Sequence, residues 1–301
     1  MPADKRKRSV LITGCSDGGL GSALAVAFHE AGFHVYATAR TISKMKRLSA
    51  LGIETKELDV LSDSSIAKCV ADIPDLDILV NNAGLTMTMT STDTPMAEAK
   101  KIFDVNLWAV VALTQAFAPS LVRSKGMIVN HSSLASVIRM PLGAVYGASK
   151  AAIAQYSAIM RIELEPLGVR VVDLKTGVVG PTNLEVNKTK VDSAGSEDVL
   201  PKTSIFQPAK EVIGALIHRD YFQDEAGQSG MTPPDKWAKL VVQDLKKPNP
   251  PFIIWQGAYV FLGKLAAYLP MGWIDNMTKK AAKWDQVEAV LSKTGTKLKP
   301  S

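Results

Sequence analysis

The stretch Ser9-Val-Leu-Ile-Thr-Gly-Cys-Ser-Asp-Gly-Gly-Leu-Gly21 decides the fold class of this 301-residue chain. Ser9 to Thr13 reads as a short buried strand, because a short apolar run that ends in turn residues is typical of one. After the glycines, Ser22 to Ala31 has the apolar spacing of a helix, and Gly32 ends it. Phe33 to Ala39 follows as a second strand. This order predicts a nucleotide-binding unit, in which the backbone approaches a pyrophosphate at the helix N-terminus.

The rest of the chain repeats the alternation of strands and helices. Further strands are expected at 54–60, 77–80, 127–130, 169–174 and 252–255, and helices at 41–51, 62–73, 95–121 and 146–167. The pattern predicts the α/β class, with a Rossmann-type doubly wound parallel sheet of about seven strands and helices on both faces. We expect a basic N-terminal tail at 1–8, one domain at 9–250 and a C-terminal extension at 251–301.

Composition narrows the compartment and the partners. The two cysteines, Cys15 and Cys69, provide no disulfide framework, which fits a reducing compartment such as the cytosol. The chain opens with Lys and Arg rather than an apolar run, so we expect no secretory signal. The net charge is +6, but basic and aromatic residues do not interleave as on a nucleic-acid platform. We therefore expect no nucleic-acid partner, and no metal site.

Three polar residues stand out on the predicted helices. Tyr146 and Lys150 are four residues apart, so their side chains share one helix face. A neighbouring ammonium favours the phenolate and lowers a tyrosine pKa from its usual value of about 10. Taken alone, a Tyr and a Lys at this spacing usually form a solvated helix face with a half-buried ring. Asn106 lies inside a predicted helix although Asn is a poor helix former, and such local inconsistencies are typical of functional sites.

With these positions in hand, residues 9–240 resemble the short-chain dehydrogenase/reductase family. The glycine turn, Asn81-Asn82-Ala83-Gly84, Asn106, Ser133 and the Tyr146/Lys150 pair occur in that family's order, and Ser133 lies 13 positions before Tyr146. The resemblance implies that Tyr146 donates a proton to a carbonyl oxygen, which Ser133 orients. It also implies that Lys150 lowers the Tyr146 pKa and holds the nicotinamide ribose, and that Asn106 anchors a water. His131 is expected to be structural.

The expected cofactor is NADP(H). Arg40 ends the second predicted strand, where an acidic residue suits an NAD ribose and a basic residue suits a 2′-phosphate; an ordinary surface arginine is the alternative. Asp59, at the end of the third strand, is a candidate acceptor for the adenine amino group. The cofactor-binding candidates are Gly14, Ser16, Gly18, Gly19, Leu20, Gly21, Arg40, Asp59, Val60, Asn82, Ala83, Gly84, Tyr146, Lys150, Gly177, Val179 and Thr182.

The chain departs from the family pattern at two places. Gly21 is the final glycine of the turn, whereas the common spacing places that glycine at position 20, so the role of each glycine is open. Thr176-Gly177 stands in place of the usual Pro-Gly, which removes the rigid φ of proline. The lengthened turn, Tyr36 to Arg40 and Val172 to Val179 are similar to the fungal 1-acyldihydroxyacetone-phosphate reductase-like branch. That likeness implies NADPH-dependent ketone reduction.

These features predict an NADPH-dependent carbonyl reductase whose substrate is a lipophilic ketone. The substrate is expected to be 1-acyldihydroxyacetone phosphate-like or a ketone of fungal secondary metabolism. The alternative is a non-catalytic NADP(H)-binding or membrane-surface scaffold of the same fold. Residues 183–235 are expected to fold over the substrate, and Thr86, Met140 and Leu142 are the pocket candidates. By analogy with the family we expect a homodimer or homotetramer.

The apolar segment 252–274 has three possible roles. Lys264 is its only charged residue, and its length nearly suffices to span a bilayer, although Gly257 and Pro270 interrupt it. It is a helix that closes the core or a dimer interface, a helix that rests on a membrane surface, or a spanning helix. The second role implies peripheral contact of a cytoplasmic protein with the endoplasmic reticulum or a lipid droplet. The Lys-rich end of the chain is expected to be disordered.

Overall fold

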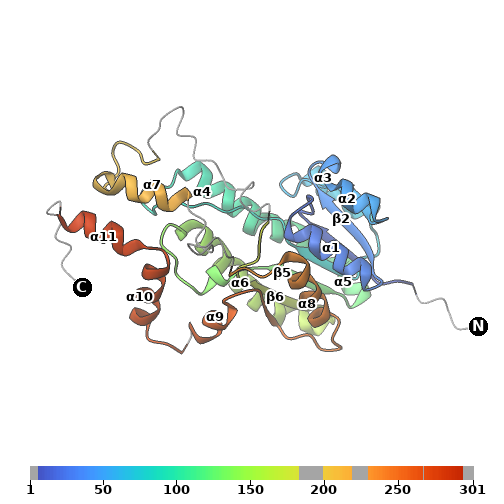
Figure 1. Cartoon of the computed structure of the whole chain (residues 1–301). Coiled ribbons are helices and arrows are strands. Elements are labelled where there is room, and N and C mark those ends of the chain that lie inside the picture. The colour runs from blue at the N-terminus through green and yellow to red at the C-terminus, as the bar shows by residue number, and fades with distance from the viewer. Residues whose placement is uncertain (1–5, 183–198, 219–229, 267, 294–301) are drawn as a thin grey trace, which may run out of the picture.

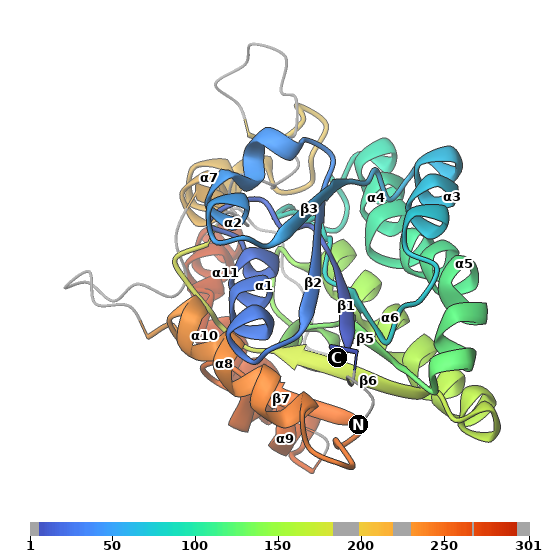
Figure 2. The ribbon, with the colours of Figure 1, turned by 90° about the vertical axis from the view of Figure 1, so that its right-hand side faces the viewer.

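The computed structural model describes residues 6–182, 199–218, 230–266 and 268–293. A seven-stranded sheet of order β3-β2-β1-β4-β5-β6-β7 forms its centre, and every neighbouring pair is parallel (Figures 1 and 2). The strands are β1 (Ser9–Thr13), β2 (His34–Ala39), β3 (Glu54–Glu57), β4 (Ile78–Asn81), β5 (Met127–His131), β6 (Arg170–Thr176) and β7 (Ile253–Gln256). The strand order reverses between β1 and β4, which makes the sheet doubly wound and confirms the predicted class.

Helices cover both faces of the sheet, as the view in Figure 2 shows. They are α1 (Leu20–Glu30), α2 (Lys46–Ala50), α3 (Asp63–Asp72), α4 (Met96–Phe103), α5 (Ala109–Ser124), α6 (Ala144–Leu164), α7 (Lys210–His218), α8 (Pro234–Leu245), α9 (Val260–Ala266), α10 (Met271–Ala281) and α11 (Trp284–Lys293). Successive strand side chains point to opposite faces. Val10 and Ile12 therefore join the core under α1 and α8, while Leu11 joins the core under α3, α5 and α6.

Two predicted elements are shorter in the structure. The segment 41–51 begins as a 3₁₀ turn, Ile42–Met45, before α2. The third strand ends at Glu57 rather than Val60. Leu58 N still donates to Ala39 O at 3.0 Å, but the Asp59 carboxylate then accepts a bond from Leu61 N at 3.1 Å. This side-chain bond turns the chain away from the sheet.

The long predicted helix at 95–121 contains a π-helical turn. Asp104–Trp108 joins α4 to α5 in π conformation, with Asn106 buried at its centre. Single π turns inside helices are frequent at functional sites, so the irregularity that Asn106 predicted is real. Among the described residues, Met96–Ser124 alone has the length and apolar composition of a membrane-spanning helix. Its apolar residues include Phe117 and Leu121, which lie in the core against the sheet.

The sheet continues past the predicted domain boundary at residue 250, because β7 pairs with β6. Segment 252–274 therefore contains β7, then α9, then the start of α10, and its interpretation as one spanning helix is wrong. A strand that is bonded to the sheet cannot belong to such a helix. Two parts of the predicted substrate region at 183–235, residues 183–198 and 219–229, lie outside the described residues. The described part of this region includes α7.

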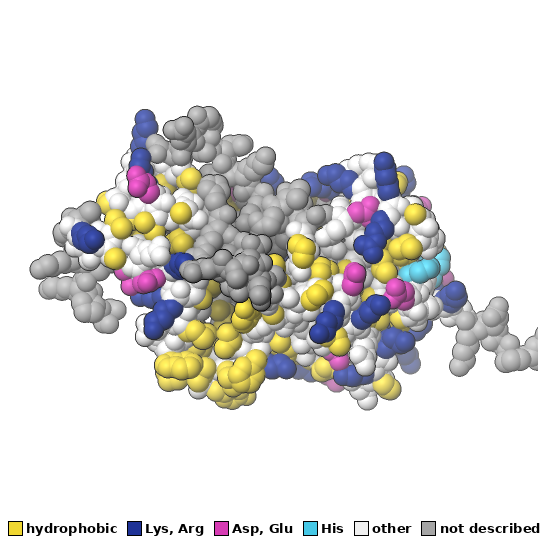
Figure 3. All heavy atoms as spheres, in the orientation of Figure 1, with side chains coloured by type: hydrophobic (Ala, Val, Ile, Leu, Met, Phe, Trp, Pro, Cys, Tyr) yellow, Lys and Arg dark blue, Asp and Glu magenta, His cyan; other side chains and the backbone are white. Residues whose placement is uncertain are grey.

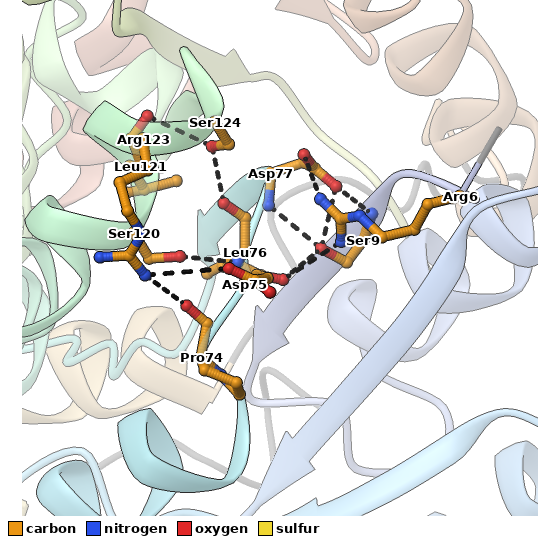
Figure 4. Close-up of polar contacts among 10 residues, drawn as sticks. All are labelled: Arg6, Ser9, Pro74, Asp75, Leu76, Asp77, Ser120, Leu121, Arg123 and Ser124. Carbon is orange, nitrogen blue, oxygen red and sulfur yellow. Dashed lines mark hydrogen bonds and ion pairs between the residues drawn. The ribbon is translucent and has the colours of Figure 1, made fainter. Parts of the chain in front are cut away.

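A polar cluster joins the amino ends of the strands to α5 (Figure 4). Asp77 accepts bonds from Ser9 N at 2.6 Å and from the Arg6 guanidinium at 3.0 Å, so part of the predicted basic tail at 1–8 contacts the domain. Leu76 N donates to Ser120 Oγ at 2.7 Å, and Ser124 Oγ donates to Leu76 O at 2.8 Å. This cluster lies at the end of the sheet opposite to the carboxyl ends of the strands, where ligands bind in such folds.

Candidate active site

A cleft of about 440 Å³ opens at the carboxyl ends of β1, β4, β5 and β6. Its volume is in the usual range for small-molecule sites. The predicted site residues that line it are Gly14, Ser16, Gly19, Leu20, Arg40, Asp59, Val60, Asn82, Ala83, Gly84, Ser133, Tyr146, Lys150, Gly177, Val179 and Thr182. Parallel strands end at one edge of the sheet, so the fold gathers side chains that are far apart in the sequence.

The structure assigns a role to each glycine of the lengthened turn. Gly14 and Gly18 have φ of +74° and +80°, which L side chains rarely adopt. Gly19 is the N-cap of α1 and has no side chain to cap the first turn, and both Gly19 and Leu20 line the cleft. A Cβ on Gly21 would lie 2.5 Å from Gly14 O and 2.5 Å from Asn82 Nδ2. Gly21 therefore permits the close approach of α1 to the turn.

Asn82, His131 and Thr176 form a hydrogen-bonded row across the floor of the cleft. Asn82 Nδ2 donates to Thr13 O at 2.7 Å, so its Oδ1 is the acceptor that meets His131 Nδ1 at 2.9 Å. His131 Nδ1 must then carry the proton, and Nε2 accepts from the Thr176 hydroxyl at 2.6 Å. Burial lowers the His131 pKa to about 3, so the ring is neutral. His131 is structural, and Thr176, which replaces proline, orients it.

Ser133, Tyr146 and Lys150 meet beside this row. Lys150 lies on α6, is only 6% exposed, and its Nζ donates to the backbone oxygen of His131 at 2.7 Å. The same Nζ is 5.9 Å from the centre of the Tyr146 ring. Ser133 lies two residues after the end of β5. Its hydroxyl oxygen accepts a hydrogen bond from Ala135 N at 3.1 Å. The strand end and the helix therefore present a hydroxyl, a phenol and an ammonium to one point.

The proton affinities of this group follow from its burial. Burial raises the pKa of the Tyr146 phenol, and a hydrogen bond with Ser133 opposes this rise. The predicted lowering of the Tyr146 pKa by Lys150 is not found in the protein alone: burial raises this pKa, and the opposing cause is Ser133 rather than Lys150. Burial also lowers the Lys150 pKa to about 8, against the influence of the Asp173 carboxylate. Tyr146 is thus a neutral phenol, the form that can donate a proton.

Asn106 connects the π turn to the helix of the catalytic candidates. Its Oδ1 accepts from Leu85 N at 2.8 Å, and its Nδ2 donates to Leu85 O and to Ser149 Oγ, both at 2.9 Å. Ser149 in turn donates to the backbone oxygen of Tyr146 at 2.7 Å. Both amide hydrogens of Asn106 therefore have protein partners. The proposed contact of Asn106 with a water stays a prediction.

Several predicted residues lie outside the cleft, and others were missed. Leu142 is buried against Met87 and Met89 in a third core cluster, so it packs rather than lines the site. Gly18, Gly21, Asn106, Thr86 and Met140 are also absent from the lining of this cleft as the described residues form it. The lining residues that sequence reasoning missed are Ala39, Leu58, Leu61, Leu85, Lys101, Val105, His131, Ser132 and Thr176. Leu58, Leu61, Leu85 and Ser132 lie in irregular segments, where the sequence has no periodicity to follow.

Comparison with known proteins identifies the family. The family model described as short chain dehydrogenase matches residues 8–192, more than half of the chain. The chain belongs to the short-chain dehydrogenase family. This short-chain dehydrogenase is 47% identical over 282 residues to a short-chain dehydrogenase/reductase of Pestalotiopsis microspora, covering 94% of this chain and 96% of the relative. It is therefore an oxidoreductase.

The expected likeness to one fungal branch of the family is confirmed. The short-chain dehydrogenase is 34% identical over 281 residues to the NADPH-dependent 1-acyldihydroxyacetone phosphate reductase of Schizosaccharomyces pombe, covering 88% of this chain and 90% of that enzyme. Among solved structures, a short-chain dehydrogenase from Streptomyces avermitilis matches with a TM-score of 0.69 at 24% identity, covering 97% and 99% of the two chains. The latter likeness supports the fold.

The buried ammonium gives this short-chain dehydrogenase an expected pH dependence. The groups that face Lys150 are neutral His131, Tyr146 and the Asp173 carboxylate, and the Lys150 pKa is about 8. Lys150 is charged below that pH and neutral above it. We expect kcat/KM for reduction to be level below pH 8 and then to fall by roughly tenfold per pH unit. A pH–rate profile that stays level to pH 10 would show that turnover does not depend on the positive charge of Lys150.

Proposed function

We propose that this short-chain dehydrogenase is an NADPH-dependent carbonyl reductase in which Tyr146 is the proton donor. The observation that carries the proposal is the meeting of Ser133, Tyr146 and Lys150 at one end of the cleft. The uncapped start of α1 borders the same cleft, and Arg40 lines it as well. An oxidoreductase site needs a hydride carrier and an acid close together, and this arrangement supports both.

The residues of the cleft fit a pyridine dinucleotide phosphate. The uncapped amides at the start of α1 suit a pyrophosphate. A Cβ on Gly14 would lie 2.9 Å from Ala83 Cα, so the glycine allows the turn to lie close to the segment that follows β4. Arg40 is exposed, and within the described residues it makes no hydrogen bond or ion pair that would occupy its guanidinium. A 2′-phosphate is a suitable partner for such a group. The Schizosaccharomyces pombe relative is named as NADPH-dependent, which supports the same choice.

Bound NADPH supplies the hydride, and the protein supplies the rest of the chemistry. Ser133 orients the carbonyl oxygen, and the neutral phenol of Tyr146 gives it a proton as negative charge develops there. The Lys150 ammonium stabilises the phenolate that this transfer leaves. Because the phenol pKa is raised in the protein alone, the positive charges of Lys150 and of the oxidised nicotinamide are needed to hold the phenolate.

The direct test is consumption of NADPH by the purified protein with a panel of ketones. We expect oxidation of NADPH with at least one lipophilic ketone, and tight NADPH binding by fluorescence titration. Binding without turnover on any ketone would favour the non-catalytic scaffold. Absence of both binding and turnover would reject the proposal altogether.

The charge of Arg40 provides a test of cofactor choice. Replacing a charge-assisted bond of about 1.5–3 kcal/mol by repulsion in Arg40→Glu is expected to raise KM for NADPH by roughly 10- to 150-fold. KM for NADH should change little, because NADH has no 2′-phosphate. Lys44→Glu makes a like charge change on the adjoining 3₁₀ turn, outside the cleft lining, and is the control. Equal losses in the two variants would point to general electrostatics rather than a 2′-phosphate contact.

We propose a lipophilic substrate, either 1-acyldihydroxyacetone phosphate-like or a ketone of fungal secondary metabolism. The relative named as a 1-acyldihydroxyacetone phosphate reductase supports the first choice. Arg139, which lies between Ser133 and Tyr146 in the sequence, is a candidate partner for a substrate phosphate. Its Nε donates to Asp275 Oδ1 at 2.8 Å, so the phosphate would compete with that carboxylate. Paired assays of an acyl dihydroxyacetone with and without its phosphate distinguish the choices: only the first requires the phosphate.

We further propose that α9 and α10 rest on a membrane surface. Large apolar side chains are exposed there, and Figure 3 shows them gathered along the lower edge of the molecule over these helices. The residues and their exposed fractions are Tyr259 47%, Phe261 65%, Tyr268 85%, Met271 67% and Trp273 62%. The lysines Lys264 and Lys280 are exposed on the same two helices. Aromatic residues beside lysines suit an anionic lipid interface.

Flotation with phosphatidylserine-containing vesicles tests this surface. We expect Met271→Ser/Trp273→Ser to reduce the bound fraction by at least roughly tenfold, because two exposed apolar side chains no longer enter the lipid. Met96→Ser/Trp108→Ser is a matched control, since these residues are 67% and 58% exposed elsewhere. Equal binding of the two double variants would reject the α9–α10 surface.

The proposed location follows from this surface. We propose a cytoplasmic protein that lies peripherally on the endoplasmic reticulum or on lipid droplets, where a lipophilic ketone is concentrated. The homodimer or homotetramer expected by analogy with the family stays a prediction. Light scattering of the purified protein measures it directly.

A further inference from the structure

Strand β6 carries two charged residues where a central parallel strand is expected to be apolar. Asp173 and Lys175 are 2% and 5% exposed, and two positions apart they lie on one face of the strand. Lys175 Nζ and Asp173 Oδ2 are 2.8 Å apart. A buried ion pair is weak evidence for stability, because apolar residues of similar volume often serve as well. The other hydrogen bonds of Asp173 and Lys175 therefore indicate the role of this ion pair.

The remaining bonds of the pair reach both sides of Ser133. Asp173 Oδ1 accepts a short hydrogen bond from the Ser132 hydroxyl. Lys175 Nζ donates to Ser136 Oγ at 2.8 Å, and Ser136 Oγ donates to the backbone oxygen of Ser133 at 2.7 Å. The residues immediately before and three positions after Ser133 are thus both tied to β6. Ser133 itself lies in extended conformation between these two ties.

The surroundings leave the pair few other partners. Lys175 Nζ lies 5.7 Å from the centre of the Trp255 ring. Trp255 is thus the third partner of this ammonium, after Asp173 and Ser136. Helix α9 closes this region from outside: a Cβ on Gly263 would lie 2.4 Å from Leu134 Cδ1 and 2.6 Å from Trp255. The Asp173 carboxylate also acts on Lys150, whose pKa it raises against the effect of burial. The Lys175 ammonium and the Asp173 carboxylate therefore both interact with groups next to Ser133 and Lys150.

We propose that Asp173 and Lys175 are positioning residues that hold the Ser132–Ser136 segment, and with it the Ser133 hydroxyl, in register with Tyr146. This role rests on the proposed carbonyl reduction for its effect on turnover, but the effect on the segment does not. Without the two ties, Ser133 samples positions from which its hydroxyl misses the Tyr146 phenol and the substrate oxygen. Such misplacement affects the chemical step more than cofactor binding.

The main test replaces both charges by apolar residues of similar volume. In Asp173→Leu/Lys175→Met we expect a folded protein, NADPH affinity within about twofold of wild type, and kcat lowered by roughly 10- to 100-fold. Hydrogen exchange of the peptide covering 132–138 should become at least several-fold faster, which needs no substrate. Faster exchange with no ketone turned over by the wild type would support positioning while rejecting the proposed reaction. Wild-type exchange of the segment in a folded double variant would overturn the positioning role.

Two milder variants decide the matter if the double variant fails to fold. Ser136→Ala cuts only the tie from Lys175 to Ser133 O, and we expect faster exchange of 132–138 and a lower kcat with unchanged KM for NADPH. Ser124→Ala is the matched control, because Ser124 Oγ also donates to the backbone oxygen three residues earlier, at the far end of the sheet. Equal exchange and kcat in these two variants would overturn the proposal.

The charge of Asp173 gives a readout that a purely structural role would not move. Asp173 raises the Lys150 pKa, so in Asp173→Asn the decline of kcat/KM on the alkaline side should begin at lower pH than in wild type. The Ser136→Ala variant keeps the carboxylate and should keep the wild-type midpoint. A midpoint of Asp173→Asn equal to that of wild type would overturn the part of the proposal that couples Asp173 to Lys150.

Discussion

Tyr146→Phe is expected to lower kcat for ketone reduction by roughly 10²- to 10⁴-fold, the usual contribution of a general acid. The phenol is half-buried and neutral, and it lines the same cleft as Ser133 and Lys150. The substitution removes one hydroxyl and keeps the ring that packs in the site. NADPH affinity, measured by fluorescence titration, should therefore change by less than about threefold, because the lost group acts on the reacting oxygen.

Tyr156→Phe is the matched control for this substitution. Tyr156 lies on the same helix, α6, and packs against the core rather than lining the cleft. Its replacement should leave kcat and KM within about twofold of wild type, because it removes a single hydroxyl group outside the cleft. Wild-type turnover in Tyr146→Phe would reject the proton-donor role, and another acid in the cleft would have to be sought.

Gly21→Ala is expected to destabilise the fold and to weaken cofactor binding. A Cβ at this position would lie 2.5 Å from Gly14 O, a backbone atom that cannot turn away, and 2.5 Å from Asn82 Nδ2. Either α1 moves out or the turn opens, so we expect a loss of about 2–3 kcal/mol in the free energy of unfolding. NADPH binding should weaken by roughly tenfold or more, because the same movement displaces the amides at the start of α1.

Gly272→Ala is the control for the glycine substitution. Gly272 lies in the first turn of α10, and a Cβ there meets nothing within 4 Å. Alanine in a helix should leave stability unchanged or raise it by up to about 1 kcal/mol. Thermal unfolding and NADPH titration of the two variants compare the sites directly. A Gly21→Ala protein as stable as Gly272→Ala would mean that the turn relaxes freely, contrary to its packing.

The sequence alone was sufficient for the sheet and for most of the site. The apolar runs of β1, β4 and β5 are unambiguous because a parallel strand buried on both faces has no polar alternation. The residues at the ends of these strands then follow, because the carboxyl ends of parallel strands share one edge. The order of Ser133, Tyr146 and Lys150 along the chain likewise depends only on local spacing and on family resemblance.

Other features depended on contacts that no local pattern encodes. The Leu142 side chain was assigned to the substrate pocket, but it packs against Met87 and Met89 from a loop that is distant in the sequence. The predicted lowering of the Tyr146 pKa by Lys150 is not found, because burial raises this pKa and the extent of burial depends on the full surroundings of the phenol.

The glycine turn shows the same division most clearly. The sequence by itself determined that a glycine-rich turn joins β1 to α1, and it predicts a nucleotide phosphate as the ligand of this turn. Only the tertiary structure decided which glycine does what: Gly14 and Gly18 supply the left-handed backbone, and Gly21 supplies the close contact with Gly14 and Asn82. It also joined Asp173 and Lys175 to the Ser133 segment. The physical reason is that backbone conformation and side-chain proximity are set by packing between strands that are distant in sequence.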